Sequence, residues 1–113
     1  MKYTVYHNPR CSKSREAVAF LQEQNAEIEI IEYLKDSPTE SEIKALLQKL
    51  NIPAIDLVRK GEELFKTNYK DKTLSEKEWI KILAENPILI ERPVIVKGNK
   101  AVIARPTEKI NEL

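Results

Sequence analysis

Apolar and polar residues at the start of the chain follow a pattern that changes period twice. Tyr3, Val5 and their neighbours make residues 2–6 β-prone, which predicts a β-strand that leads into a turn at Asn8-Pro9. Apolar residues then recur at the spacing i, i+3, i+4 and predict an α-helix from about 12 to 24. In 27–32, isoleucines separated by glutamates predict a second strand, which completes a βαβ unit. The apolar residues in these patterns are Tyr3, Val5, Ala17, Phe20, Leu21, Ile28, Ile30 and Ile31.

The middle of the chain predicts two further helices. Thr39 with Glu42, and Ser75 with Glu78, have the spacing of a capping box, which satisfies free N–H groups at a helix start. Trp79 falls on the apolar face of the second helix, and we interpret it as a core residue rather than a platform for a ligand. The apolar positions are Ile43, Leu46, Leu47 and Leu50 before Pro53, then Trp79, Ile82 and Leu83 before Pro87.

The end of the chain predicts a β-hairpin and a closing helix. Residues 94–96 and 101–103 are apolar and mostly β-branched, and they flank Gly98-Asn99, a pair typical of tight turns. Pro106 is suited to the first turn of a helix that follows.

The predicted order is β-α-β, a helical insert, and β-β-α. This is the order of a thioredoxin-like α/β fold, and we assign residues 1–113 to one domain of this kind. In that fold the proline before the third strand is usually cis and packs beside the reactive sulfur. We therefore predict a cis bond at Pro93, with a trans proline that begins the strand as the alternative.

The composition excludes several classes of protein. The charged residues, 33% of the chain, alternate in sign and give a formal net charge of +1, so we expect no nucleic-acid binding. One cysteine and one histidine are too few for a structural zinc site, and we expect no bound metal or cofactor. No apolar stretch approaches the ~20 residues of a membrane span, and no leader pattern is present. We expect a cytoplasmic protein without membrane contact, for which nothing demands more than a monomer.

Cys11 is the only cysteine, and it lies between the first predicted strand and the first predicted helix. A thiol at a helix N-terminus faces unpaired N–H groups, which favour the reactive thiolate. Arg10, Lys13 and Arg15 add positive charge nearby, so we predict a nucleophile. The alternative, a small buried core residue, fits poorly because residues 7–16 contain no large aliphatic side chain.

Arginine is scarce in this chain. Only five of the 19 basic residues are arginines, and Arg92 and Arg105 each stand directly before a proline, which keeps them out of a helix. Arginine can donate paired hydrogen bonds to an oxyanion. These positions suggest anion recognition; the alternative is that some of the arginines, Arg10 and Arg15 above all, are ordinary surface residues.

Three segments together resemble the glutaredoxin-dependent arsenate reductases of the ArsC/Spx family. They are 6–15 (YHNPRCSKSR), 75–79 (SEKEW) and 86–96 (NPILIERPVIV), and their order and spacing also agree. The resemblance implies a thioredoxin-like fold and reduction of arsenate to arsenite, with glutathione and glutaredoxin as the electron source. One departure is Ser12-Lys13, where the best-studied members usually have glycine and a small hydroxyl residue.

The resemblance also implies roles for individual residues. The nucleophile falls on Cys11, and the residues that bind substrate or support the loop fall on His7, Asn8, Ser14 and Pro93. The family's three anion-site arginines fall on Arg59, Arg92 and Arg105.

A lone cysteine constrains the chemistry. Without a second thiol the chain cannot finish through an internal disulfide, so an external thiol such as glutathione must act next. Two other functions stay open: a monothiol, glutathione-dependent thiol-disulfide reductase with another substrate, and an Spx-like regulator that binds RNA polymerase. The usual Cys-x-x-Cys switch of the latter is absent, because Ser14 stands at the second position.

Overall fold

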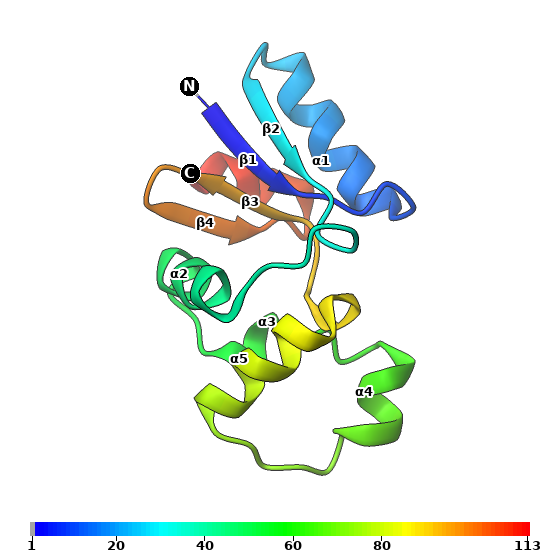
Figure 1. Ribbon diagram of the computed structural model, residues 1–113. Coiled ribbons are helices and arrows are strands. Elements are labelled where there is room, and N and C mark those ends of the chain that lie inside the picture. The colour runs from blue at the N-terminus through cyan, green and yellow to red at the C-terminus, as the bar shows by residue number, and fades with distance from the viewer. Residues whose placement is uncertain (1) are drawn as a thin grey trace. The chain divides into compact units, whose positions relative to one another are not determined.

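The computed structural model describes residues 2–113, and the chain divides into two compact units. Unit 1 comprises residues 2–36 and 92–113, and unit 2 comprises residues 37–91. Unit 1 carries the β-sheet, and unit 2 consists mainly of helices (Figure 1). The assignment of 1–113 to one domain stays a prediction, and residue 1 lies outside the described residues.

The sheet of unit 1 has four strands in the order β2-β1-β3-β4. β1 pairs in parallel with β2 and antiparallel with β3, and β3 pairs antiparallel with β4. The hairpin turn contains Gly98 at φ +61°, a left-handed conformation that glycine adopts without steric cost. The predicted βαβ unit and hairpin are therefore confirmed. The elements of unit 1 are β1 (Lys2–Tyr6), α1 (Ser12–Glu23), β2 (Glu27–Ile31), β3 (Val94–Lys97), β4 (Lys100–Ile103) and the 3-10 helix η2 (Thr107–Glu112).

The core of unit 1 forms where α1 and η2 meet the sheet. Val5 of β1 lies opposite Ile95 of β3, and both are fully buried together with Ala17 and Leu21 of α1. Ile110 of η2 joins the same cluster. This packing fixes the start of α1, and with it the residues around Cys11, against the C-terminal end of β1.

The closing helix differs from the prediction. It forms as the 3-10 helix η2, with hydrogen bonds such as Lys109 N–H to the Pro106 carbonyl, three residues back. The element spans six residues, Thr107–Glu112, and buries Ile110; short helical segments of this kind are often 3-10 helices. The last element of the predicted order is thus helical but not α-helical.

Unit 2 begins its two long helices with the predicted capping boxes. Thr39 and Glu42 cap each other's backbone N–H groups, and Ser75 and Glu78 do the same. Trp79 is buried, with its ring centroid 6.2 Å from that of Phe65, which confirms its interpretation as a core residue. The elements are α2 (Glu40–Leu50), α3 (Ala54–Leu57), α4 (Glu63–Asn68), α5 (Glu76–Glu85) and the 3-10 helix η1 (Pro87–Leu89).

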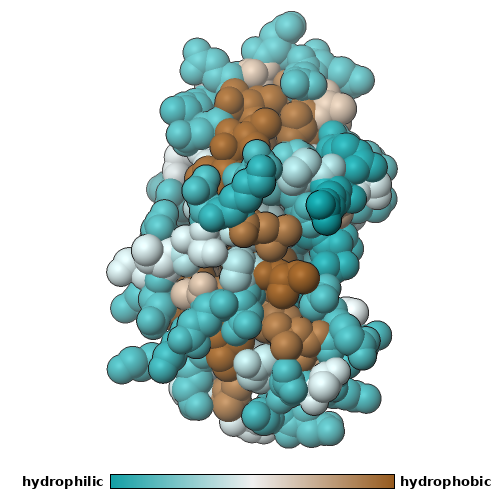
Figure 2. Space-filling model, turned by 45° about the vertical axis from the view of Figure 1, so that its right-hand side comes forward, coloured by the Kyte–Doolittle hydropathy of each residue, from teal (hydrophilic) through white to brown (hydrophobic). Residues whose placement is uncertain are grey.

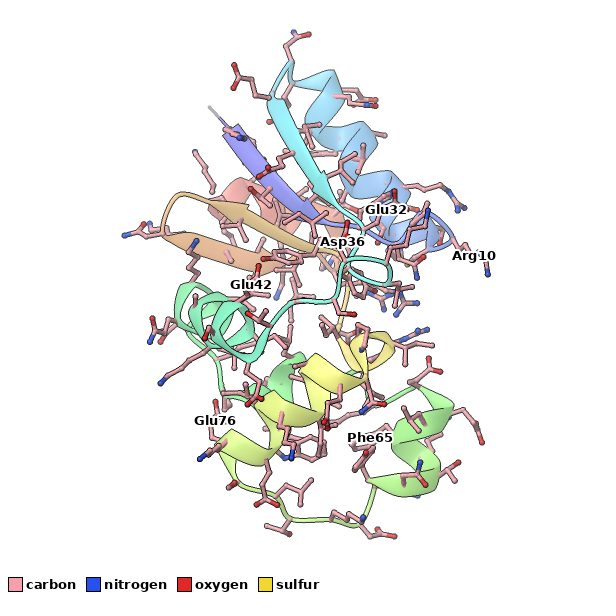
Figure 3. The ribbon with its side chains drawn as sticks, in the orientation of Figure 1. Arg10, Glu32, Asp36, Glu42, Phe65 and Glu76 are labelled. Atoms are coloured by element: carbon pink, nitrogen blue, oxygen red, sulfur yellow. The ribbon has the colours of Figure 1, made fainter. Side chains whose placement is uncertain are left out.

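Contacts distant in sequence organise the rest of unit 2. Both carboxylate oxygens of Glu76, labelled in Figure 3, accept from the Ala54 N–H at the start of α3, at 2.9 and 3.0 Å. Val58 and Ile90 form an antiparallel bridge, which holds the backbone on either side of them. The short helices α3, α4 and η1 were not predicted from the sequence, because helices of this length show no apolar periodicity.

The peptide bonds Arg92–Pro93 and Arg105–Pro106 are cis in the structure. The first is the bond for which the sequence predicts the cis form. Pro93 is buried, and its carbonyl accepts from the Ala104 N–H at 2.9 Å, which joins the segments that carry the two arginines.

The surface of the described residues is mainly polar. Figure 2 shows hydrophobic patches between hydrophilic side chains on the face it draws. Three large apolar side chains are exposed, and they are Ile30, Leu34 and Ile88. No helix within residues 2–113 has the length and apolar character needed to cross a membrane.

Candidate active site

Cys11 occupies the N-cap position of α1. Its backbone is extended, its N–H donates to the Asn8 carbonyl at 2.9 Å, and its carbonyl accepts from the Arg15 N–H at 3.1 Å. The residue is only 8% exposed. The loop therefore presents the thiol at the start of the helix, as predicted, but largely shielded from solvent.

The pKa of Cys11 lies well below its ordinary value. Burial raises this pKa. Four other groups outweigh burial and lower the pKa to about 7: the N–H groups of Ser14 and Lys13, the Arg92 charge and the Ser14 hydroxyl. These N–H groups belong to the first turn of α1, where unpaired donors favour a negative charge on the sulfur. The reactive thiolate is therefore present in a substantial amount near pH 7.

The source of this activation differs from the sequence-based expectation. Arg10 and Arg15 are not among the groups that lower the Cys11 pKa, and Lys13 acts through its N–H rather than its charge. Arg15 instead donates from Nη1 to the Pro9 carbonyl at 2.9 Å and supports the loop. Lys13 pairs with Glu16 at 3.5 Å.

Ser14 and Asn8 hold the loop in shape. Ser14 is completely buried, and its Oγ accepts from the Asn8 N–H at 3.4 Å. The Asn8 side chain accepts from the Arg10 N–H at 3.0 Å, while its carbonyl accepts from Cys11. These hydrogen bonds connect the end of β1, the Cys11 loop and the start of α1.

His7 continues the pairing of β1 with β2. Its N–H donates to the Ile31 carbonyl at 2.8 Å, and its buried Nδ1 has no hydrogen-bond partner in the described part of the chain. Burial lowers the His7 pKa, Glu32 raises it and Arg15 lowers it, with a net pKa below the usual 6.5. The imidazole is therefore mainly neutral at pH 7.

Arg92 is a buried and largely unpaired cation. The residue is 8% exposed, and its Nε and Nη1 have no hydrogen-bond partner within residues 2–113. Its carbonyl accepts from Nε of the exposed Arg105 at 2.7 Å. An isolated buried charge costs several kcal/mol, so the guanidinium favours an anion as its partner. Unit 1 thus brings Cys11, Arg92 and Arg105 into one region.

Arg59, the third predicted anion-site arginine, belongs to unit 2. Its N–H donates to the Leu89 carbonyl at 2.6 Å, and Nη1 pairs with Glu62 at 2.9 Å. Both side chains are partly buried, at 30% and 19% exposure. The sequence analysis missed Glu62, although an acidic residue three positions after an arginine is a usable signal for such a pair.

A cavity of about 260 Å³ lies beside the Cys11 loop within unit 1. It is lined by residues 7–10, which follow β1, and by Glu32, Leu34 and Lys35, which follow β2. The sequence analysis did not connect these segments, because strand pairing alone brings them together. Within the described part of the chain no three potential metal ligands cluster.

The family model that matches this chain is that of the ArsC family, over residues 6–113. The chain belongs to the ArsC family. It is 37% identical to the arsenate reductase of Haemophilus influenzae, with 100% of this chain and 99% of that protein covered. It is 41% identical to the Escherichia coli protein named "Uncharacterized protein YfgD", with 96% and 93% covered.

A solved structure of the ArsC family also matches closely. The arsenate reductase from Vibrio cholerae superposes with a TM-score of 0.94 at 41% identity, and 99% of this chain and 97% of that chain are covered. The thioredoxin-like α/β fold predicted from the sequence is therefore confirmed. The roles of individual site residues stay predictions.

Proposed function

We propose that this protein reduces arsenate to arsenite through Cys11, with glutathione and glutaredoxin as the reductants. The observation that carries the proposal is the buried Arg92 guanidinium, unpaired at Nε and Nη1, whose charge helps to ionise Cys11. A thiolate and an anionic substrate repel each other unless cations offset their charges. Names of family members, such as the arsenate reductases of Haemophilus influenzae and Vibrio cholerae, point to the same substrate.

In the first step the Cys11 thiolate attacks arsenic. A sulfur–arsenic bond forms, and one arsenate oxygen leaves as water after protonation. Arg92 and Arg105 stabilise the remaining oxygens, since guanidinium groups donate several hydrogen bonds and keep their charge. Arg59 is the third arginine that the family resemblance assigns to this task.

In the second step a glutathione thiolate attacks the Cys11 sulfur. The sulfur–arsenic bond breaks, and its electron pair reduces arsenic from the +5 to the +3 state. The mixed disulfide between Cys11 and glutathione remains, because the chain has no second cysteine. A glutaredoxin thiolate attacks the glutathione sulfur and releases Cys11 as thiolate.

The direct test is arsenate-dependent NADPH oxidation with glutathione, glutaredoxin and glutathione reductase. We expect turnover by the wild type, none by Cys11→Ser, and a severe loss in Arg92→Met. Lys100→Met, at the exposed turn of the hairpin, is the matched control for loss of one positive charge. Turnover that survives in Cys11→Ser would refute the proposal.

A second outcome would favour the monothiol reductase with another substrate. In that case arsenate causes no NADPH oxidation, while Cys11 still forms a glutathione adduct that glutaredoxin removes. The moderately acidic thiol supports either reaction, whereas the buried cation favours the oxyanion. Saturable binding to the RNA polymerase α-subunit, without turnover of arsenate, would favour the Spx-like regulator that binds RNA polymerase.

A further inference from the structure

The cavity beside the Cys11 loop lies where the two parallel strands of unit 1 end. Tyr6 of β1 pairs with Ile31 of β2, and His7 extends this pairing by donating to the Ile31 carbonyl. The chain then leaves both strands in loops that border the same cavity of about 260 Å³. The region outside the carboxyl ends of parallel strands is the usual location of ligand sites in open α/β sheets.

The loop after β2 is held in a defined turn. Lys35 N–H and Asp36 N–H both donate to the Glu32 carbonyl at 2.9 Å. This arrangement places Glu32, Leu34 and Lys35 along one wall of the cavity. Figure 3 labels Arg10 and Glu32, which lie in the same region of unit 1, near the ends of β1 and β2.

The charges at the cavity have both signs. Arg10 is exposed, its guanidinium has no hydrogen-bond or ion-pair partner within residues 2–113, and it does not contribute to the Cys11 pKa. The Glu32 side chain is 40% exposed, and its one ion pair within residues 2–113 is with Lys35, at 3.7 Å, whose side chain is 79% exposed. An ion pair this exposed contributes little to stability, so a ligand cation can replace Lys35 as the partner of Glu32.

Part of the cavity lining is apolar. Leu34 is 41% exposed although it is large and apolar, and it lines the cavity together with Pro9. A ligand that suits these walls has a carboxylate for Arg10, an ammonium group for Glu32 and a short aliphatic chain for Leu34. An α-amino acid head group combines the first two.

We propose that this cavity binds the zwitterionic amino-acid end of the peptide thiol that reacts at Cys11. The inference rests on the proposed function, for which it locates the external thiol. The cavity is next to the reacting residue, because Asn8 lines it and accepts from the Cys11 N–H at 2.9 Å. Arg10 and Glu32 hold the two ends of the zwitterion, and the thiol reaches towards Cys11.

Disulfide exchange tests this site without arsenate. The Cys11 thiolate attacks a symmetric disulfide, a mixed disulfide forms, and one thiolate leaves, so no other oxidant is needed. Three probes are compared: oxidised glutathione, which carries zwitterionic ends; dithiodipropionate, which carries carboxylates alone; and bis(2-hydroxyethyl) disulfide, which is uncharged. The rate of adduct formation is followed by mass spectrometry.

The expected pattern separates recognition of a zwitterion from general attraction. Arg10→Gln lowers the rate with both charged disulfides by about fivefold and leaves the uncharged one unchanged. Glu32→Gln lowers the rate with oxidised glutathione, but leaves or raises the rate with dithiodipropionate. Lys100→Gln, the matched loss of one exposed positive charge, changes none of the three beyond a small effect of net charge.

Two results would overturn the proposal. If Glu32→Gln changes the rate equally with all three disulfides, its effect is on the Cys11 thiol itself and not on ligand binding. If neither variant changes any of the rates, the cavity is not the binding site of the peptide thiol. A failure of the arsenate reaction is distinguishable, because it abolishes arsenate-dependent NADPH oxidation and leaves disulfide exchange intact.

Discussion

Arg92 in unit 1 and Arg59 in unit 2 are the same side chain in opposite environments. Arg92 is 8% exposed, with Nε and Nη1 unpaired, whereas the Arg59 guanidinium is held by Glu62 at 2.9 Å. The resemblance to arsenate reductases assigns both to one task. Of these two arginines, only Arg92 has buried hydrogen-bond donors that find no partner within residues 2–113, so its charge is the stronger source of anion affinity.

The Arg59 ion pair contributes to stability, whereas the unpaired Arg92 guanidinium contributes to anion binding. An ion pair that is partly buried satisfies its own charges and has little affinity left for a third group. A buried cation without a partner destabilises the fold and recovers that energy when an anion binds. The contrast predicts that replacing Arg92 by methionine, which keeps much of the bulk, costs activity rather than stability, whereas breaking the Arg59–Glu62 pair costs stability.

The largest expected effect is on catalysis. Arg92→Met lowers kcat/KM for arsenate by roughly 10²–10³-fold, as removal of one oxyanion donor does in other enzymes. Arg59→Met has a smaller effect, because Glu62 already shares its charge. Steady-state NADPH oxidation measures both. An equal loss in the two variants would show that the Glu62 pair does not set Arg59 apart.

The next effect is on the ionisation of Cys11. Its alkylation by iodoacetamide follows the thiolate, so the rate falls as the pH drops through the pKa of about 7. Arg92→Met raises this pKa and moves the profile to higher pH, because a favourable charge is lost. Lys13→Met leaves the midpoint in place, since the backbone N–H remains. A shift in Lys13→Met would mean that its side-chain charge matters after all.

A further effect is on stability. Arg92→Met raises the free energy of unfolding by roughly 1 kcal/mol or leaves it unchanged, since an unpaired buried charge is replaced by an apolar side chain. Urea unfolding at neutral pH, without oxyanions in the buffer, measures this value. A clear loss of stability would imply that Arg92 has a structural partner in solution.

The smallest effect concerns the pair in unit 2. Glu62→Gln lowers the free energy of unfolding by at most about 1 kcal/mol, because both side chains keep some solvent exposure. The same unfolding experiment at low and high salt detects it, and added salt should reduce the difference. A larger, salt-independent loss would indicate that Glu62 supports the start of α4 in another way.

Much of the fold could be predicted because its signals are local. The capping boxes at Thr39 and Ser75 depend on residues three positions apart, and the strands follow from short runs of β-prone residues beside turn residues. The short helices α3 and α4 could not be predicted in this way. Their residues are held by distant contacts, such as the Glu76 carboxylate at the start of α3 and Phe65 against Trp79.

The sequence by itself determined which residues could carry the chemistry. A lone cysteine between a strand and a helix, with arginines before two prolines, was sufficient to nominate Cys11, Arg92 and Arg105. Only the tertiary structure decided that Nε and Nη1 of Arg92 are buried without a partner among residues 2–113, that Arg59 pairs with Glu62, and that backbone N–H groups activate the thiol. The reason is physical: residue identity fixes which charges and donors exist, whereas their energies depend on burial and on neighbours that folding brings within hydrogen-bond distance.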